Sequence, residues 1–458
     1  MQAVVSPILD RAPVKAGPNF GLVAVILLAL AICLGLAIAV DPAIAYLAVV
    51  AVAGPAVAYY VVSRPSVAVA VALASHAWAV ELAGPYLTPF KIAGVLALFV
   101  VARDIVQKHR VHPVPKWFAA GMVALLLLVA TSELLAEYEG SIAPFFEFGG
   151  TLVVFLLLTQ TILTSEDIRT FSRVYAINLL LTFASVWREV GWAALGESGT
   201  RASGICGQPN VLGNHLAMSL PFALALLLDR KASMPWRLLG LFAALGSAYG
   251  EWGAASRGGT IGYMFALFTF ALLAPRRPTV RVTAVVVAVL AAMAFSGFSP
   301  KSFSRVTETF DGSTDIETAT SERALHARIG ADMLPRHPFL GFGITAFGYE
   351  RSRYSGTLGG ALHSSVLAVA VSYGVPALAL YILLQLSGVV MVVRNLGSGP
   401  LRIYHAGLAS AAVAAITSGL SGTELFRAEQ WGLVSMCYIA ALRHHLNTRP
   451  GAPGQSGA

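Results

Sequence analysis

Residues 22–40, LVAVILLALAICLGLAIAV, contain no charged side chain. The run is apolar on every side of a helix, and it is long enough to cross a hydrocarbon layer of about 30 Å. A transmembrane β-strand would instead be a segment of about 10 residues in which apolar and polar residues alternate. The stretch therefore predicts a transmembrane α-helix, and its length favours a retained helix over the core of a signal peptide.

Similar apolar runs recur along most of the 458 residues. Charged residues make up 12% of the chain, whereas soluble domains carry about 25%. We therefore predict an all-α, polytopic transmembrane helix bundle of about 12–14 spans. The predicted spans are residues 19–40, 43–62, 66–83, 88–104, 117–136, 146–164, 168–187, 210–228, 236–253, 258–274, 279–297, 363–392, 402–421 and 429–443.

Lysine and arginine gather on alternate connections between these spans, which the positive-inside rule assigns to the cytoplasm together with both termini. This bias accounts for the net charge of +8, and no nucleic-acid-binding motif accompanies it, so we predict no nucleic acid partner. The three cysteines and the histidines show no metal-ligand spacing, so no metal or other cofactor is predicted.

The predicted organisation has five parts. They are N-terminal transmembrane helices (1–200), transmembrane helices with Asn/Gly-rich and SRGG elements (201–297), a long external loop (298–362), C-terminal transmembrane helices (363–448) and a disordered Pro/Gly/Ser-rich tail (449–458). The loop is expected to contain short amphipathic helices. In ERALHARIGADML (322–334), Leu325, Ile329 and Met333 share one face, with which the helix can lie on the membrane or on the bundle.

Arginines on the predicted external face depart from the positive-inside rule. Their presence there therefore needs an explanation other than membrane topology. Arg323 and Arg328 flank the apolar stripe of the loop helix, and Arg257 directly precedes two glycines. Asn210 opens a predicted helix, where it either caps the helix or marks a backbone-amide site for phosphate. Arg257 can likewise be a simple interfacial cation. Taken together, these groups indicate anion binding, because arginine donates bidentately to phosphate and stays charged.

The same elements resemble the superfamily of bacterial O-antigen ligases and polymerases. The resemblance rests on Arg323 upstream of Pro338 and LGFG (340–343), and on HSSVLAVAVSYGVPALAL (363–380). GQPNVLGNHLAMSLPFALAL (207–226) and SRGGTIGYM (256–264) resemble two further family elements. The likeness covers about residues 200–390. The chain departs from the family's usual pattern by having serine after His363 and Ala327 in place of a frequent tryptophan.

The resemblance implies a metal-independent glycosyltransferase of the bacterial, Gram-negative inner membrane whose active face is periplasmic. Its donor would be an undecaprenyl-diphosphate-linked glycan within the membrane lipids, and its acceptor lipid A-core or another glycan. A repeat-unit polymerase is the alternative, and a transporter of lipid-linked glycans is a more distant one. The residues expected to act in catalysis are His363, Arg257 and Arg323, and those expected to bind diphosphate or glycan are Arg328, Arg201, Asn210 and Asn214.

The role of His363 stays open between a base for the acceptor hydroxyl and a ligand of the diphosphate. Four glutamates on the external side are alternative bases: Glu133, Glu137, Glu139 and Glu147.

Overall fold

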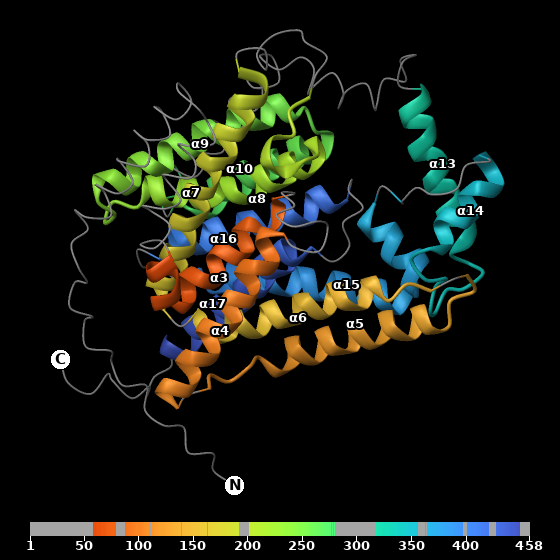
Figure 1. Ribbon diagram of the computed structural model, residues 1–458, viewed down its shortest axis with the longest axis horizontal. Helices are drawn as coiled ribbons and strands as arrows, with labels where there is room; N and C mark the ends of the chain where they lie inside the picture. The colour runs from red at the N-terminus through yellow and green to blue at the C-terminus, as the bar shows by residue number, and fades with distance from the viewer. Residues whose placement is uncertain are drawn as a thin grey trace.

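The computed structural model describes residues 58–78, 88–109, 111–138, 140–162, 164–191, 201–275, 277, 279, 317–355, 362, 364–396, 401–420 and 427–448. Within these ranges the chain is helical and contains no strand (Figure 1). The long helices are α3 (Pro65–Ala74), α4 (Pro89–Lys108), α5 (Lys116–Leu134), α6 (Ala143–Thr161), α7 (Ser165–Val190), α8 (Pro209–Leu228), α9 (Met234–Ala254), α10 (Arg257–Leu273), α13 (Glu317–Met333), α14 (Ala346–Ser355), α15 (Ser365–Arg394), α16 (Arg402–Gly419) and α17 (Ala428–Thr448).

The predicted all-α polytopic bundle is confirmed. Four described helices, α5, α6, α8 and α15, are long and apolar enough to cross a membrane, and Pro65–Ala77 and Arg257–Leu273 are shorter apolar helices. The predicted span 19–40 lies outside the described residues, as do all of 279–297 except its first residue, most of 43–62 and the end of 66–83.

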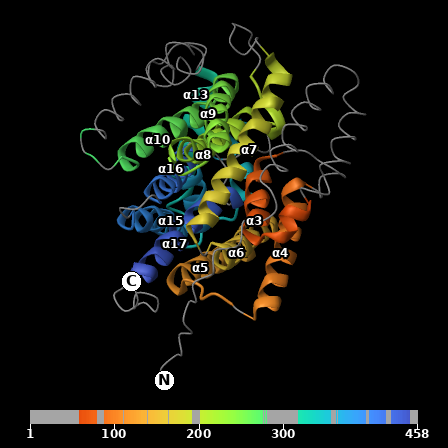
Figure 2. The same ribbon diagram turned by 90° about the vertical axis from the view of Figure 1, so that its left-hand side faces the viewer.

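Helix α8 lies at the centre of the bundle, where α7, α9, α10 and α16 surround it (Figure 2). Its sequence is apolar on every side, and a helix of that kind is stable only when it is enclosed. Nearly all of its side chains are buried, including the polar Asn214 and His215. Helix α8 carries Asn210 and Asn214, two of the residues predicted to bind substrate. Because α8 is enclosed, four other helices surround the part of the chain that holds them.

Helices α8 and α10 run parallel and very close together. A Cβ atom on Gly259 of α10 would lie 2.7 Å from the Cα of Gly213 in α8, so only glycine permits this approach. Further along, a Cβ on Gly262 would lie 3.4 Å from that of Ala217. Small residues at such contacts are typical of membrane helices, which gain their stability from close packing. The two helices therefore begin side by side.

At the opposite end of this group of helices, charged and polar side chains form contacts between neighbouring helices. The Asp229 carboxylate accepts a hydrogen bond from the Tyr404 hydroxyl at 2.7 Å and lies 3.3 Å from Nε of Arg169. Arg402 donates to the carbonyl oxygen of Leu273 at 3.0 Å. These contacts join α7, α8, α10 and α16 at the end that the charge bias predicts to be cytoplasmic.

Helix α15 is broken near its first third. Gly374 has φ 85° and ψ 172°, and Pro376 has no N–H to donate to the carbonyl oxygen of Ser372. The N–H of Val375 turns away and donates to the carbonyl oxygen of Pro338 at 2.7 Å. The carbonyl groups of Val371 and Ser372 are thereby released from the helix and need other donors.

The loop Pro338–Gly343 supplies those donors. The N–H of Phe342 donates to the carbonyl oxygen of Val371 at 3.0 Å, and that of Gly343 to the carbonyl oxygen of Ser372 at 2.9 Å. Ser132 of α5 adds a hydroxyl bond to the same Ser372 oxygen at 2.6 Å. The two sequence elements that carry part of the family resemblance, one in the loop and one in α15, therefore bind one another.

We expect Gly374→Ala to destabilise the protein by more than the roughly 1–3 kcal/mol that an unfavourable backbone conformation costs. Its Cβ would also lie 2.3 Å from the carbonyl oxygen of Phe339. The apparent unfolding temperature of purified protein in detergent measures the effect. Gly94→Ala in α4 is the matched control, since nothing lies within 4 Å of its Cβ position. Equal unfolding temperatures for the two variants would contradict the expected role of the break.

The loop helix α13 confirms the predicted amphipathic pattern. Ile329 and Met333 are almost fully buried, Leu325 is partly buried, and α13 packs on α15. A Cβ on Gly330 would lie 3.0 Å from the Leu367 side chain, close to the start of α15. The apolar stripe therefore faces the bundle. Figure 1 shows α13 and α14 beyond one end of α5 and α6.

Candidate functional site

Three polar residues are hydrogen-bonded to one another where α8 and α10 begin, and Arg257 lies next to them in the chain. The Asn210 side-chain oxygen accepts hydrogen bonds from Nη2 of Arg201 at 2.9 Å and from the Ser256 hydroxyl at 3.3 Å. Arg257 follows Ser256 directly and is half-buried. We call this group, Arg201, Asn210, Ser256 and Arg257, the mouth. It brings together three of the residues that the sequence predicted.

The local backbone explains how the mouth is held. Ala255 adopts a left-handed conformation at the end of α9, so the chain turns sharply, and the Ser256 hydroxyl then caps α10 by accepting from the N–H of Gly259 at 3.2 Å. Nε of Arg201 donates to the carbonyl oxygen of Ala254 at 2.9 Å. Both arginines are therefore positioned by the turn between α9 and α10.

The charge at the mouth is suited to anions. The starts of two parallel helices lie together there, and each carries about half a positive charge from its aligned peptide dipoles. The guanidinium groups of Arg201 and Arg257 add to this positive field. Backbone N–H groups at helix N-termini and arginine forks are the groups that proteins use to bind phosphate.

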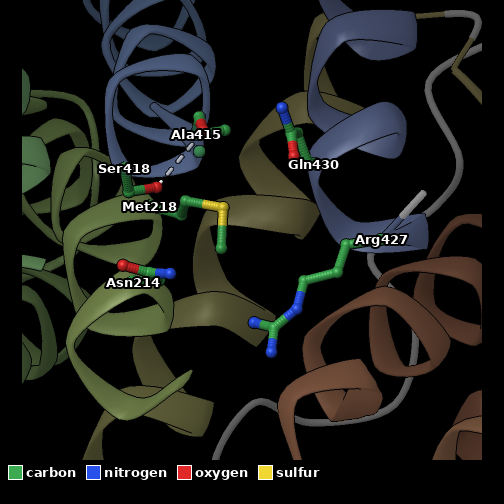
Figure 3. Close-up of a pocket in the computed structure, with 7 residues that line it drawn as sticks. Asn214, Met218, Ala415, Ser418, Arg427 and Gln430 are labelled. Atoms are coloured by element: carbon green, nitrogen blue, oxygen red, sulfur yellow. Dashed lines mark hydrogen bonds between the residues drawn. The ribbon is translucent and has the colours of Figure 1, made fainter. Parts of the chain in front are cut away.

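A small cavity lies one helical turn deeper. Asn214 follows Asn210 by four residues, about 6 Å along α8. It lines the cavity together with residues of α8, α16 and the start of α17: Met218, Ala415, Ser418, Gly419, Arg427 and Gln430. Figure 3 shows the Asn214 amide and the Arg427 guanidinium directed into this space from opposite sides.

A buried polar chain lies beside the cavity and joins four helices. Nδ1 of His215 lies 2.9 Å from a carboxylate oxygen of Glu429, and both side chains are fully buried. Nε2 of His215 lies 2.7 Å from the amide nitrogen of Asn178, which also donates to the carbonyl oxygen of Ala74 at 3.1 Å. Because that amide donates, Nε2 accepts and Nδ1–H donates to Glu429. The chain links α3, α7, α8 and α17.

The sequence analysis did not predict several of these residues as part of a site. Arg427 lies on a predicted external connection, so the broken charge bias that singled out Arg257 could have found it. His215, Glu251 and Glu429 are fully buried in helices, and no local pattern marks them. Glu251 accepts a hydrogen bond from the Thr260 hydroxyl at 3.1 Å, between α9 and α10.

The loop arginines are only partly placed. Arg323 and Arg328 both belong to α13, and the Arg328 side chain is exposed. The side chain of Arg323 and all of His363 lie outside the described residues. Ser364 caps α15, and a Cβ on Gly419 would lie 3.6 Å both from the Ser365 hydroxyl and from the Gln430 amide nitrogen. The start of α15 therefore lies at the wall of the cavity.

Two of the predicted alternative bases have other partners. The two carboxylate oxygens of Glu133 accept backbone N–H bonds from Ile344 and Ser141, both at 2.9 Å, so this buried group holds the loop to α5. Glu137 lies 3.5 Å from His337, with both side chains half exposed. Glu147 is exposed on α6, and Glu139 lies outside the described residues.

Glu350 holds α14 in place. Its carboxylate accepts hydrogen bonds from Tyr138 at 2.8 Å, Arg336 at 2.7 Å and Arg353 at 2.9 Å. Burial raises the pKa of this carboxyl, but the bonds from Arg336 and Tyr138 and the nearby positive charges outweigh it, so the pKa lies below its ordinary value. The contribution of the cluster to stability is therefore present near neutral pH and is lost as pH falls through that lowered pKa.

The chain matches a known protein family over part of its length. Residues 242–382 match the family described as O-antigen ligase. The matched region runs from α9 into α15, so it includes Arg257, Arg323, the loop Pro338–Gly343 and the break at Gly374. No curated protein matches the chain.

Proposed function

Because residues 242–382 place the chain in the O-antigen ligase superfamily, we propose that it transfers an undecaprenyl-diphosphate-linked glycan to an acceptor at the periplasmic face of a bacterial inner membrane. The acceptor of a ligase is lipid A-core. The observation that carries this proposal is the mouth, where two parallel helix N-termini and two arginines converge at the end of an otherwise apolar bundle.

The mouth suits the diphosphate of such a donor, whose lipid tail stays in the bilayer. During transfer, an acceptor hydroxyl oxygen forms a bond to the anomeric carbon of the glycan, while the bond from that carbon to the phosphate oxygen breaks. Undecaprenyl diphosphate leaves with the bonding electron pair. The growing negative charge on the leaving group is stabilised by Arg257 and Arg201 together with the helix N-termini, and such stabilisation is usually the largest catalytic term.

Arg323 and His363 complete the proposed site. Helix α13 packs beside the start of α15, which itself borders the cavity below the mouth. In the proposal Arg323 adds charge to the diphosphate site, and Arg328 assists it. His363 either takes the proton of the acceptor hydroxyl or binds the diphosphate, and an imidazole suits both roles near neutral pH.

The proposal predicts that purified full-length protein in detergent will form new glycosidic bonds from undecaprenyl-diphosphate-linked O-antigen and lipid A-core. Undecaprenyl diphosphate should be released in equal amount. Because arginines and helix dipoles supply the positive charge, transfer should persist in the presence of a chelator. Mass spectrometry of the extracted lipids measures both products.

The alternative activities give different products in this assay. A polymerase would lengthen the lipid-linked glycan without using lipid A-core. A transporter would form no glycosidic bond in detergent and would move the donor across proteoliposomes instead. Either result would contradict the ligase proposal.

A further inference from the structure

An apolar side chain is exposed on the loop Pro338–Gly343. Phe339 is 75% exposed, although the backbone around it is fixed in the break of α15. The carbonyl oxygen of Pro338 accepts a hydrogen bond from the N–H of Val375 at 2.7 Å. The carbonyl oxygen of Phe339 packs against Gly374, where a Cβ would lie only 2.3 Å from it. The phenyl ring is therefore held outward on a firm support.

Further exposed apolar side chains lie at the same end of the bundle. Nε2 of His337 lies 3.5 Å from the Glu137 carboxylate. A Cβ on Gly343 would lie 2.8 Å from that of Ala136, so the loop rests on the residues that follow α5. The exposed apolar side chains there belong to the loop, the end of α5 and the start of α6: Phe339, Leu134, Leu135, Ile142 and Phe146. We call this group the apolar rim, and grouped apolar exposure of this kind marks an interaction surface.

The apolar rim is continuous with the surface that the membrane-spanning helices present to lipid. Helices α5, α6 and α15 are apolar enough to cross a membrane, and exposed apolar side chains continue along them: Val123, Leu127, Val153, Leu156, Leu383 and Leu386. Beyond the rim, towards α14, the exposed Arg336 and Arg353 both bind Glu350 (Figure 1). An apolar band that ends in an aromatic ring and is followed by arginines is typical of the boundary between acyl chains and headgroups. The partner that fits the rim is therefore a lipid surface.

The course of α15 gives the same level for the membrane surface. The Ser132 hydroxyl, near the end of α5, donates to the carbonyl oxygen of Ser372 at 2.6 Å. A Cβ on Gly419, where α16 ends, would lie 3.6 Å from the Ser365 hydroxyl. The segment 365–373 therefore passes from the end of α16 to the end of α5, across the predicted external side of the bundle. The rest of α15 has about 20 residues, the length that crosses a hydrocarbon layer of about 30 Å.

We propose that the apolar rim is seated in one leaflet of the bilayer, at the level where acyl chains meet headgroups. Helix α15 then crosses the membrane only from Val375 onward, and the segment 365–373 lies along the membrane surface. This inference goes beyond the proposed reaction, since it names a lipid surface as the partner of the loop. It also bears on the site: α13 packs on this segment, where a Cβ on Gly330 would lie 3.0 Å from Leu367. A loop anchored in lipid therefore also sets the height of α13, the helix of Arg323, above the membrane.

Nitroxide spin labels on the full-length protein test the depth of each position. The native cysteines are replaced by alanine, and single cysteines are introduced by Phe339→Cys, Arg353→Cys, Val375→Cys and Leu383→Cys. Each labelled protein is reconstituted into vesicles of phosphatidylethanolamine and phosphatidylglycerol. Oxygen, which partitions into lipid, should relax the label at position 339 more strongly than a water-soluble nickel complex does. The order should reverse at the control position 353, whose side chain is 62% exposed on the charged side of the rim.

The two labels on α15 test where this helix enters the membrane. If it crosses from Val375 to Arg394, the middle of the bilayer lies near Leu383, so oxygen should relax the label at 383 more strongly than the label at 375. A helix that crossed from residue 363 would instead place Val375 close to the middle. Stronger relaxation by oxygen at 375 than at 383 would therefore overturn the proposal.

Two other results would overturn it as well. Relaxation of the labels at 339 and 353 by the nickel complex to the same extent would show that the apolar rim faces water. Dipolar broadening between labels at 339, removed by dilution with unlabelled protein, would assign the rim to a contact between two copies of the chain. Leu135→Cys serves in place of Phe339→Cys if the latter lowers the unfolding temperature in detergent. Because no glycan transfer is measured, failure of the ligase proposal would leave these results unchanged.

Discussion

Arg257→Ala is expected to lower glycan transfer by about 10²–10³-fold, the loss that follows removal of one preorganised donor to a developing negative charge. The residue begins α10 beside the Ser256 cap, and its neighbour is bonded to Asn210 and through it to Arg201. Arg257→Lys should restore only part of the rate, because an ammonium keeps the charge but loses the planar fork. Initial rates of lipid A-core glycosylation by purified protein measure both variants.

The control for this loss is Arg230→Ala, since Arg230 is exposed beyond the opposite end of α8. Its transfer rate should equal that of the wild-type protein. Arg323→Ala and His363→Ala should each lower transfer at least as strongly as Arg257→Ala, while each protein remains inserted in the membrane. Near-normal transfer by all three variants would rule out the assignment of these residues to the site.

Glu429→Ala is expected to reduce the free energy of unfolding by about 1–3 kcal/mol, the usual cost of leaving a buried hydrogen-bond donor without its acceptor. The pair is fully buried, and His215 would lose the group to which its Nδ1–H donates. Asn178 on the other side of the imidazole cannot take over, because its amide donates as well. Glu429→Gln should cost much less, since its side-chain oxygen still accepts from His215.

The apparent unfolding temperature in detergent measures this effect, and Glu137→Ala is the control. Glu137 also pairs with a histidine, but both partners are 50% exposed, and exposed ion pairs contribute about 0–1 kcal/mol. The double variant His215→Ala with Glu429→Ala should be less destabilised than the sum of the single variants, because the two residues share one interaction. Additive effects, or a stable Glu429→Ala protein, would show that the buried hydrogen bonds from Ala74 to Glu429 contribute little to the stability of the bundle.

The helical architecture could be predicted from sequence because it depends on local properties. Long apolar runs determine α5, α6, α8 and α15, and a four-residue apolar spacing determines the buried stripe of α13. The family expected from the motifs around Arg257, Arg323 and Gly341 agrees with the match over residues 242–382. The assignment of individual site residues remains a prediction, since the described part of the chain lacks His363 and the Arg323 side chain.

The pairing of distant elements could not be predicted in the same way. Gly374 and Pro376 indicate a break in α15. Only the fold shows that the carbonyl groups released by this break accept hydrogen bonds from the N–H groups of Phe342 and Gly343. Glu133 was expected on the external side as a possible base, yet its carboxylate binds backbone N–H groups of the loop. Hydrogen bonds between segments far apart in sequence leave no periodic signal.

The sequence by itself determined that this chain is a helical membrane protein with a cluster of arginines on one predicted face. Hydrophobicity and charge are properties of individual residues, so their pattern can be seen in the sequence alone. Only the tertiary structure decided that Arg201, Asn210 and Arg257 meet at two parallel helix starts, and that Asn214, Arg427 and the His215–Glu429 pair lie just below them. That arrangement depends on which helices contact α8 and at which position along its axis. Both are set by close packing between glycine-lined helix surfaces.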